Sequence, residues 1–248
     1  MIRLLDASEC DGAIELCAHD PIGIRISAAL RSYGTGYDFA RFWIGETEGA
    51  VTCVFSRVDG DMTCFFAGQH DMEEVRCFAQ AVGFRTFMCE ASRVWTSDGA
   101  ETRYFNIMRY GRRHVAVPGA RRLKTDPPLT EVWRIISSAG ELGLDESLRD
   151  VWYADMSHRI RHSAARAFTL DSDAALCTSG ETAYGSLISG VAVRPEMRGR
   201  GLGGRIVREA SEILSDGGRD VFLMCSEKLV PFYKENGYGR CGSAAVIT

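Results

Sequence analysis

The sequence predicts a mixed α/β (α+β) fold in which a mostly antiparallel sheet is flanked by helices. Short segments rich in β-branched and aromatic residues follow one another with tight turns between them. Other segments carry apolar residues at helical spacing. The order helix, helix, three strands, helix, strand occurs twice, as a repeat of expected elements and not of residue identity.

The first half of the chain supplies the first copy of this order. Asp6 or Ser8 can cap a helix that ends at Cys17, and the Asp20-Pro21 break separates it from a second helix at 22–30. The turns TEG and DGD join three strands into an antiparallel meander. The remaining expectations for this half are strands at 39–45, 50–58 and 62–67, a helix at 71–82, a strand at 84–89, and weaker strands at 103–110 and 115–117.

The second half repeats the order. Its longest amphipathic segment is a helix at 201–214, which the glycines of DGG terminate. The other expected elements are helices at 130–142 and 148–161, strands at 164–170, 174–178, 184–193 and 221–225, a short helix at 229–236, and a last strand near 244–247.

A proline-rich and basic segment, PGARRLKTDPPL, separates the halves. It predicts a linker at 119–129 between a domain of residues 1–118 and a domain of residues 130–248. A surface loop inside one domain is the alternative. The basic residues in and near this segment, Arg112, Arg113, Arg121, Arg122 and Lys124, suit a solvated linker better than a nucleic-acid site.

Composition and charge argue against several classes of protein and of binding site. The net charge of −4 gives no bulk attraction for nucleic acid. The nine cysteines form no C-x-x-C pair, which indicates a reducing compartment without disulfides or a zinc site. The amino-terminal MIRLLDASEC lacks the pattern of a signal peptide, and no apolar run approaches about 20 residues. We therefore expect a cytoplasmic protein with no nucleic-acid or membrane partner and no metal.

The stretch VAVRPEMRGRGLGG, residues 191–204, joins an expected strand to an expected helix. Glycines let backbone N–H groups approach an anion, and the start of a helix favours negative charge. Arg198, Arg200 and Arg205 add positive charge, so the loop suits a pyrophosphate. A purely structural glycine turn is the alternative.

Two nucleotide-binding motifs fit this loop poorly. Gly199, Gly201 and Gly204 have G-x-G-x-x-G spacing, but a dinucleotide fold needs the loop after its first parallel strand, and too little chain follows here. No Gly-Lys-Ser/Thr follows, which excludes a Walker loop.

The loop and its flanks, VAVRPEMRGRGLGGRIV, resemble motif A of the GNAT acetyltransferase superfamily. In that motif Arg198, Gly201 and Gly203 occupy the key positions. Downstream, VPFYKENGY at 230–238 resembles the second signature of the superfamily. The resemblance covers about residues 130–248 and implies a GNAT acyl-CoA N-acyltransferase fold, with the repeated element order suggesting a tandem arrangement.

The corresponding loop of the first half, FFAGQHDMEEVRCF, departs from motif A. It lacks R-x-x-G-x-G, and Asp71, Glu73 and Glu74 would repel a pyrophosphate. We expect a degenerate GNAT-like domain without a cofactor site, with an unrelated α+β domain as the alternative.

The resemblance implies acetyl-CoA as the cofactor and assigns roles to site residues. Tyr233 matches a general acid that protonates the departing thiolate, and Glu181 is the candidate base, with a solvated turn residue as its alternative. Ser226 stands where the family often has an asparagine that contacts pantetheine. The other expected cofactor contacts are Val191, Ala192, Val193, Arg198, Gly199, Arg200, Gly201, Leu202, Gly203 and Gly204.

The helix DVWYADMSHRIRHSA bears His158 and His162 one turn apart. A substrate contact and a surface or packing role are both open for this pair. Trp152 and Tyr153 of the same helix suit the core.

Together these features predict an acetyl-CoA-dependent N-acetyltransferase that moves an acetyl group to an amine by direct transfer. A non-catalytic CoA-binding sensor on the same fold is the alternative. The expected partner is a small-molecule or peptide amine, and a homodimer is left open.

Overall fold

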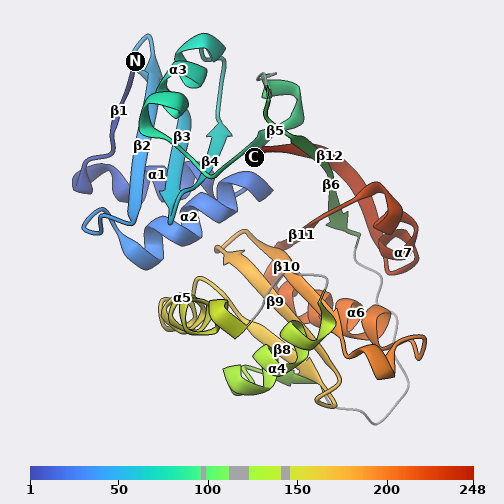
Figure 1. Ribbon diagram of the computed structural model, residues 1–248. Coiled ribbons are helices and arrows are strands. Elements are labelled where there is room, and N and C mark those ends of the chain that lie inside the picture. Colours follow the sequence, from blue (N-terminus) through green and yellow to red (C-terminus); the bar gives the residue numbers. More distant parts are fainter. Residues whose placement is uncertain (96–98, 112–122, 141–145) are drawn as a thin grey trace.

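The computed structural model describes residues 1–95, 99–111, 123–140 and 146–248 (Figure 1). Its helices are α1 (Cys10–Cys17), α2 (Pro21–Tyr33), α3 (Met72–Val82), α4 (Leu129–Ala139), α5 (Arg149–Arg161), α6 (Leu202–Leu214) and α7 (Val230–Glu235). Its strands are β1 (Ile2–Leu4), β2 (Ala40–Thr47), β3 (Ala50–Val58), β4 (Asp61–Phe66), β5 (Thr86–Glu90), β6 (Thr102–Tyr110), β7 (Leu123–Thr125), β8 (Ala167–Leu170), β9 (Ala174–Glu181), β10 (Gly185–Val193), β11 (Asp220–Cys225) and β12 (Tyr238–Ile247).

The expected mixed α/β fold is confirmed. Most elements lie within a few residues of their expected positions, but β12 begins at Tyr238, well before the expected start near 244. Residues 239–243 of this strand are exposed, so they carry no apolar alternation that would have revealed it. Of the expected linker, residues 119–122 lie outside the described residues, as does the weak strand at 115–117, and Leu123–Thr125 forms the edge strand β7 on β8.

All strands of the described residues belong to one sheet, in the order β1-β2-β3-β4-β5-β12-β6-β11-β10-β9-β8-β7. At its centre the two halves interleave, because β12 lies between β5 and β6 while β6 lies between β12 and β11 (Figure 1). The halves therefore exchange strands, and no boundary within 119–129 divides the sheet in two.

Helix α2 lies between the halves and packs on β3 and β4 as well as on β9 and β10. The Asp20 carboxylate caps it by accepting hydrogen bonds from the N–H groups of Ile22 and Gly23 at 2.8 and 3.2 Å. A Cβ at Gly180 would lie 2.9 Å from the Ile24 carbonyl oxygen, so this glycine permits the close approach of α2 to β9. The shared helix buries apolar surface from both halves.

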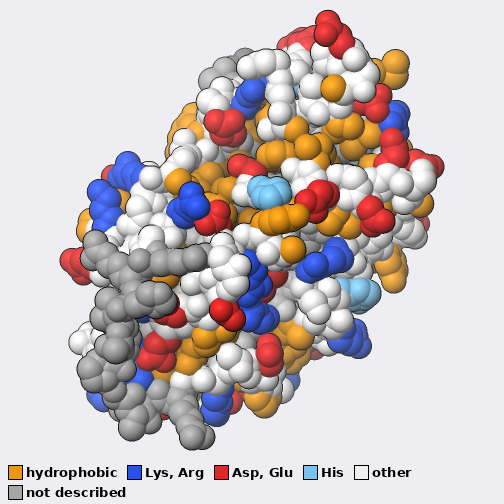
Figure 2. All heavy atoms as spheres, turned by 180° about the vertical axis from the view of Figure 1, so that it is seen from behind, with side chains coloured by type: hydrophobic (Ala, Val, Ile, Leu, Met, Phe, Trp, Pro, Cys, Tyr) orange, Lys and Arg blue, Asp and Glu red, His pale blue; other side chains and the backbone are white. Residues whose placement is uncertain are grey.

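Two further helices each pack on the strands of one half of the chain. Helix α3 packs on β3, β4 and β5, while α6 packs on β8, β9, β10 and β11. No helix among the described residues is long and apolar enough to cross a membrane. Figure 2 shows acidic and basic side chains interspersed over one face, in keeping with the small net charge.

The strand exchange predicts that neither half folds alone. We expect fragments 1–111 and 123–248 to lack a cooperative thermal transition separately and to regain one when mixed, because each supplies a central strand of the other. Circular dichroism during thermal unfolding measures this. Near-native cooperative unfolding of the isolated 123–248 fragment would contradict it.

Candidate functional site

Strands β10 and β11 diverge at their carboxyl ends. Their parallel pairing runs from Gly185 and Asp220 to Ile188 and Leu223 and then stops, although β10 continues to Val193. Beyond Ile188, β10 continues to pair with β9 after an irregularity in register, and β11 continues to pair with β6. Two strands that are each held by an outer neighbour thus leave their facing backbone groups available to a ligand.

A pocket of about 420 Å³ lies beside this divergence. It combines the end of β10, the following loop, the start of α6, and α7 with the turn before it. Its lining consists of Val191, Val193, Met197, Arg198, Gly199, Gly201, Leu202, Gly203, Gly204, Leu229, Phe232 and Tyr233. The structure therefore brings together most of the residues that the sequence assigned to the cofactor.

The start of α6 has a backbone geometry that suits an anion. Gly199 and Gly201 have φ values of 74° and 75°, which residues with a Cβ rarely adopt. Gly201 is the N-cap, and no side chain caps the helix. The first N–H groups of α6 are therefore left for another acceptor, at the positive end of the helix dipole.

The two glycines inside the first turn of α6 have different roles. A Cβ at Gly203 would make ordinary contacts, 3.5 Å from Val193 Cγ2 and 3.7 Å from Phe232 Cζ, so this position faces the pocket with room to spare. A Cβ at Gly204 would lie 2.7 Å from Asn236 Oδ1. Gly204 thus also permits the close packing of α6 on α7.

The arginines of the loop are partly engaged with the protein. Arg198 donates from Nη2 to the Ala139 carbonyl oxygen at 3.0 Å and from Nε to that of Val193 at 3.3 Å, which ties the loop to the end of α4. Arg205 pairs with Glu209 at 2.5 Å. Arg200 is exposed and does not line the pocket. The groups that the start of α6 offers to an anion are therefore mainly backbone N–H groups.

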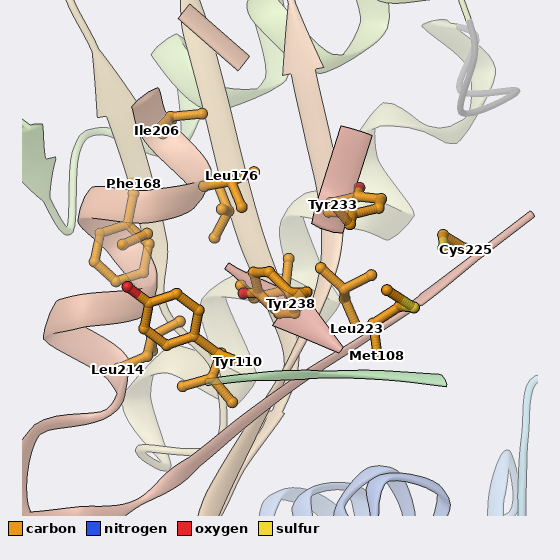
Figure 3. Close-up of a cluster of buried hydrophobic side chains, with 14 of the residues drawn as sticks. Met108, Tyr110, Phe168, Leu176, Ile206, Leu214, Leu223, Cys225, Tyr233 and Tyr238 are labelled. Carbon is orange, nitrogen blue, oxygen red and sulfur yellow. The ribbon is translucent and has the colours of Figure 1, made fainter. Parts of the chain in front are cut away.

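Tyr233 lies at the inner wall of the pocket. Its side chain is 8% exposed and lies beside Leu223, Cys225 and Tyr238 in Figure 3. Within the described part of the chain its hydroxyl makes no hydrogen bond. Burial raises the pKa of Tyr233 to about 12, so the phenol is protonated at neutral pH and can donate a proton.

This raised pKa predicts alkaline instability. A tyrosine with a higher pKa in the folded chain than in the unfolded chain stabilises the fold while it is neutral. We expect its contribution to persist below about pH 10 and to be lost between there and about pH 12. Denaturant unfolding at stepped pH measures the loss, and Tyr233→Phe should reduce its slope; an unchanged slope would contradict this assignment.

Two other expected contacts contribute no side chain to the pocket. The Ala192 side chain points to the opposite face of β10 and packs with α4, so Ala192 offers the pocket only its backbone, which is the part that the resemblance assigns to pantetheine. Ser226 does not line the pocket; its carbonyl oxygen accepts from the Leu229 N–H at 3.0 Å. Met197, Leu229 and Phe232 line the pocket without having been predicted, although Phe232 is part of the second signature.

Glu181 lies away from the pocket. It pairs with Ser186 across β9 and β10, five residues before Val191, which corresponds to about 17 Å along the strand. Its buried carboxylate accepts from Arg166 Nε at 2.8 and 2.9 Å and lies 3.5 Å from Arg219 Nη1. The structure gives Glu181 an ion pair and does not bring it to Tyr233.

Removing this carboxylate tests the structural role. We expect Glu181→Gln to lower the free energy of unfolding by about 3 kcal/mol, because Arg166 would be left as a poorly compensated charge. The exposed Glu227, paired with Arg240, provides a control whose change to Gln should cost less than about 1 kcal/mol. Urea unfolding compares the two, and equal costs would contradict the expectation.

His158 and His162 lie at the contact of α5 with α2. The His158 ring stacks on Tyr33 with centroids 4.9 Å apart, and its Nε2 donates to the Ser32 carbonyl oxygen at 2.7 Å. His162 lies beside it at 4.5 Å. Neither histidine lines the α6 pocket, and among the described residues no group of three or more His, Cys, Asp or Glu side chains could hold a metal ion.

The first half has a similar separation of two parallel strands, but the start of the helix that follows carries negative charge. Strands β4 and β5 are parallel and separate after Thr63 and Met88. Helix α3 follows, but the Asp71 carboxylate accepts from the Glu73 N–H at 2.9 Å and Glu74 lies in the same turn. A carboxylate thus already occupies the helix start that an anion would use.

Comparison with known proteins agrees with this geometry. Residues 137–246 match the family model of the acetyltransferase (GNAT) domain, so the carboxy-terminal half contains a GNAT acetyltransferase domain. No curated protein matches the sequence significantly.

Several solved structures match nearly the whole chain. A tandem GNAT protein from the clavulanic acid biosynthesis pathway has 15% identity and a TM-score of 0.59, covering 100% of this chain and 97% of that one. A Drosophila protein has 12% identity and a TM-score of 0.64, covering 99% and 97%. A GCN5-related N-acetyltransferase from Kribbella flavida has 13% identity and a TM-score of 0.58, covering 95% and 94%. The entire chain thus has the fold of tandem GNAT proteins.

Proposed function

We propose that the carboxy-terminal half transfers an acetyl group from acetyl-CoA directly to an amine. One observation carries the proposal: the end of β10 beyond its pairing with β11, the uncapped start of α6 and the protonated Tyr233 all border one pocket. These are the three groups needed to align a thioester, hold a pyrophosphate and supply a proton.

The residues present fit coenzyme A. The N–H groups at the start of α6 would hold the pyrophosphate, and the backbone of residues 191–193 would pair with the pantetheine arm as an added strand does. Acetyl-CoA supplies the acyl group as an activated thioester. Val191, Val193 and Phe232 provide apolar walls that exclude water from the arm.

Tyr233 would protonate the sulfur that leaves when the amine attacks the acetyl carbon. The lining side chains include no cysteine, serine, lysine or histidine that could carry the acyl group. This absence among the lining residues favours direct transfer over a covalent relay.

A CoA-binding sensor is the second candidate. It is favoured by the lack of a carboxylate or imidazole among the side chains that line the pocket, so that no base for the amine stands there. In a catalytic protein the base, or a water acting as one, would have to stand on the acceptor side of the diverging strands.

Release of free CoA thiol from acetyl-CoA, measured over a panel of small amines and amino-terminal peptides, separates the two. Turnover on any amine that Tyr233→Phe strongly reduces supports the transferase. Thermal stabilisation by acetyl-CoA without turnover supports the sensor, and no stabilisation by any CoA ester overturns both. We place this activity in the cytoplasm, since all nine cysteines are free thiols.

A further inference from the structure

A second pocket, of about 470 Å³, lies where the two halves meet. Helix α2 and strands β3 and β4 supply one wall, and α5 supplies the other. Its charged lining residues are Arg25, Arg85, Arg159, Asp59, Asp61 and Asp155. It shares no residue with the α6 pocket.

Arg25 is the unusual member of this set. Its side chain is partly buried and lines the pocket, yet no described residue forms an ion pair or a hydrogen bond with it. Burial, followed by the nearby Arg159, lowers its pKa, while the charges of Asp61 and Asp155 act in the opposite direction, and the guanidinium stays charged. A partly buried cation without an ion pair or a hydrogen bond is costly, and a bound anion would offset that cost.

The other charges are already paired or stand at the rim. Arg85 Nη2 lies 2.9 Å from Asp61 Oδ2, and Arg159 Nε lies 2.7 Å from Asp155 Oδ1. Asp59 is exposed on the turn between β3 and β4. Among these lining residues Arg25 is therefore the cation without an ion pair, and the exposed Asp59 is the only carboxylate left to balance it. A singly charged anion suits this site better than a phosphate facing three carboxylates.

Two hydroxyls stand in the same pocket. Ser56 and Thr63 are directly opposite each other on β3 and β4, on the face that α2 covers, and both are only 3% exposed. Neither hydroxyl makes a hydrogen bond within the described ranges. Buried hydroxyls normally have partners, and these two can donate to an anion held by Arg25.

The remaining walls are largely apolar. Ala29, Val58, Leu148, Val151 and Trp152 line the pocket around the polar end. We propose that this pocket binds a small monocarboxylate, with its carboxylate on Arg25, Ser56 and Thr63 and its apolar body against α5. The ligand would touch both halves and would stabilise their junction.

Phenylacetate is a suitable probe, and phenylacetamide is its uncharged counterpart. We expect calorimetric binding and an increase in Tm with phenylacetate and neither with phenylacetamide. Arg25→Gln should weaken binding at least about tenfold, while Arg103→Gln, which alters an exposed paired arginine that does not line the pocket, should change it less than about twofold.

The ligand-free variants separate a binding role from a structural one. Arg25→Gln should leave the Tm of the ligand-free protein unchanged or raise it, because it removes an unpaired charge. A large fall in Tm would indicate a structural role and overturn the proposal. Arg25→Lys keeps the charge and loses the bidentate fork, so it should bind more weakly than the unaltered protein.

Three further results would overturn the proposal. The first two are equal effects of phenylacetate and phenylacetamide, and binding of inorganic phosphate as strong as that of phenylacetate. The third is competition between phenylacetate and acetyl-CoA, which would indicate that phenylacetate binds in the α6 pocket. Absence of any phenylacetate binding would do the same.

Discussion

Gly203→Asp should abolish binding of acetyl-CoA while leaving the fold intact. A Cβ at this position meets only ordinary contacts at 3.5 and 3.7 Å, and a carboxylate in the first turn of a helix is favourable. The same carboxylate would face the pyrophosphate, so we expect a loss of affinity of at least about 100-fold. Isothermal titration calorimetry measures the affinity, and thermal unfolding reports the fold.

Gly203→Asn is the matched control for this change. It has nearly the same shape and no charge, so it should retain much more affinity than Gly203→Asp. Equal losses in the two variants would mean that steric blocking, and not the field at the start of α6, decides binding. The first half provides a natural parallel, because Asp71 already caps α3 there.

Tyr233→Phe should reduce kcat for acetyl transfer by about 100-fold or more, with little change in KM for acetyl-CoA. In the proposed transfer the phenol supplies the proton for the leaving sulfur, and the substitution keeps the ring that packs beside Phe232. No described residue hydrogen-bonds to the hydroxyl, so the loss of stability should be small. Initial rates of thiol release measure kcat and KM separately.

Tyr238→Phe is the control for a neighbouring buried phenol. The Tyr238 hydroxyl hydrogen-bonds to Ser211 inside the core, so its removal should cost about 1 kcal/mol of stability and leave kcat nearly unchanged. Similar losses of kcat in the two variants would contradict a specific role for Tyr233.

The sequence predicted the α6 loop well because its determinants are local. Gly199 and Gly201 adopt the left-handed backbone that such a strand-to-helix loop requires, and the helix starts directly after them. The role of Arg198 was only partly predictable, because its side chain reaches Ala139, 59 residues away in the chain.

Features that depend on distant pairing could not be predicted. The exchange of β6 and β12 joins residues more than 100 positions apart, and nothing in either segment encodes its neighbour. The sequence predicts Glu181 as a turn residue or a base. Its ion pair with Arg166 depends on the alignment of β8 with β9, which the sequence does not reveal. Arg25 gave no signal in the sequence, since its missing partner is a property of the folded surroundings.

We infer that one half of the chain binds acetyl-CoA at the start of α6 and that the other half does not. Calorimetric titration of the full chain with acetyl-CoA measures the number of sites. We predict one site per chain, lost in Gly203→Asp. Two sites per chain, or a site that survives Gly203→Asp, would contradict this inference.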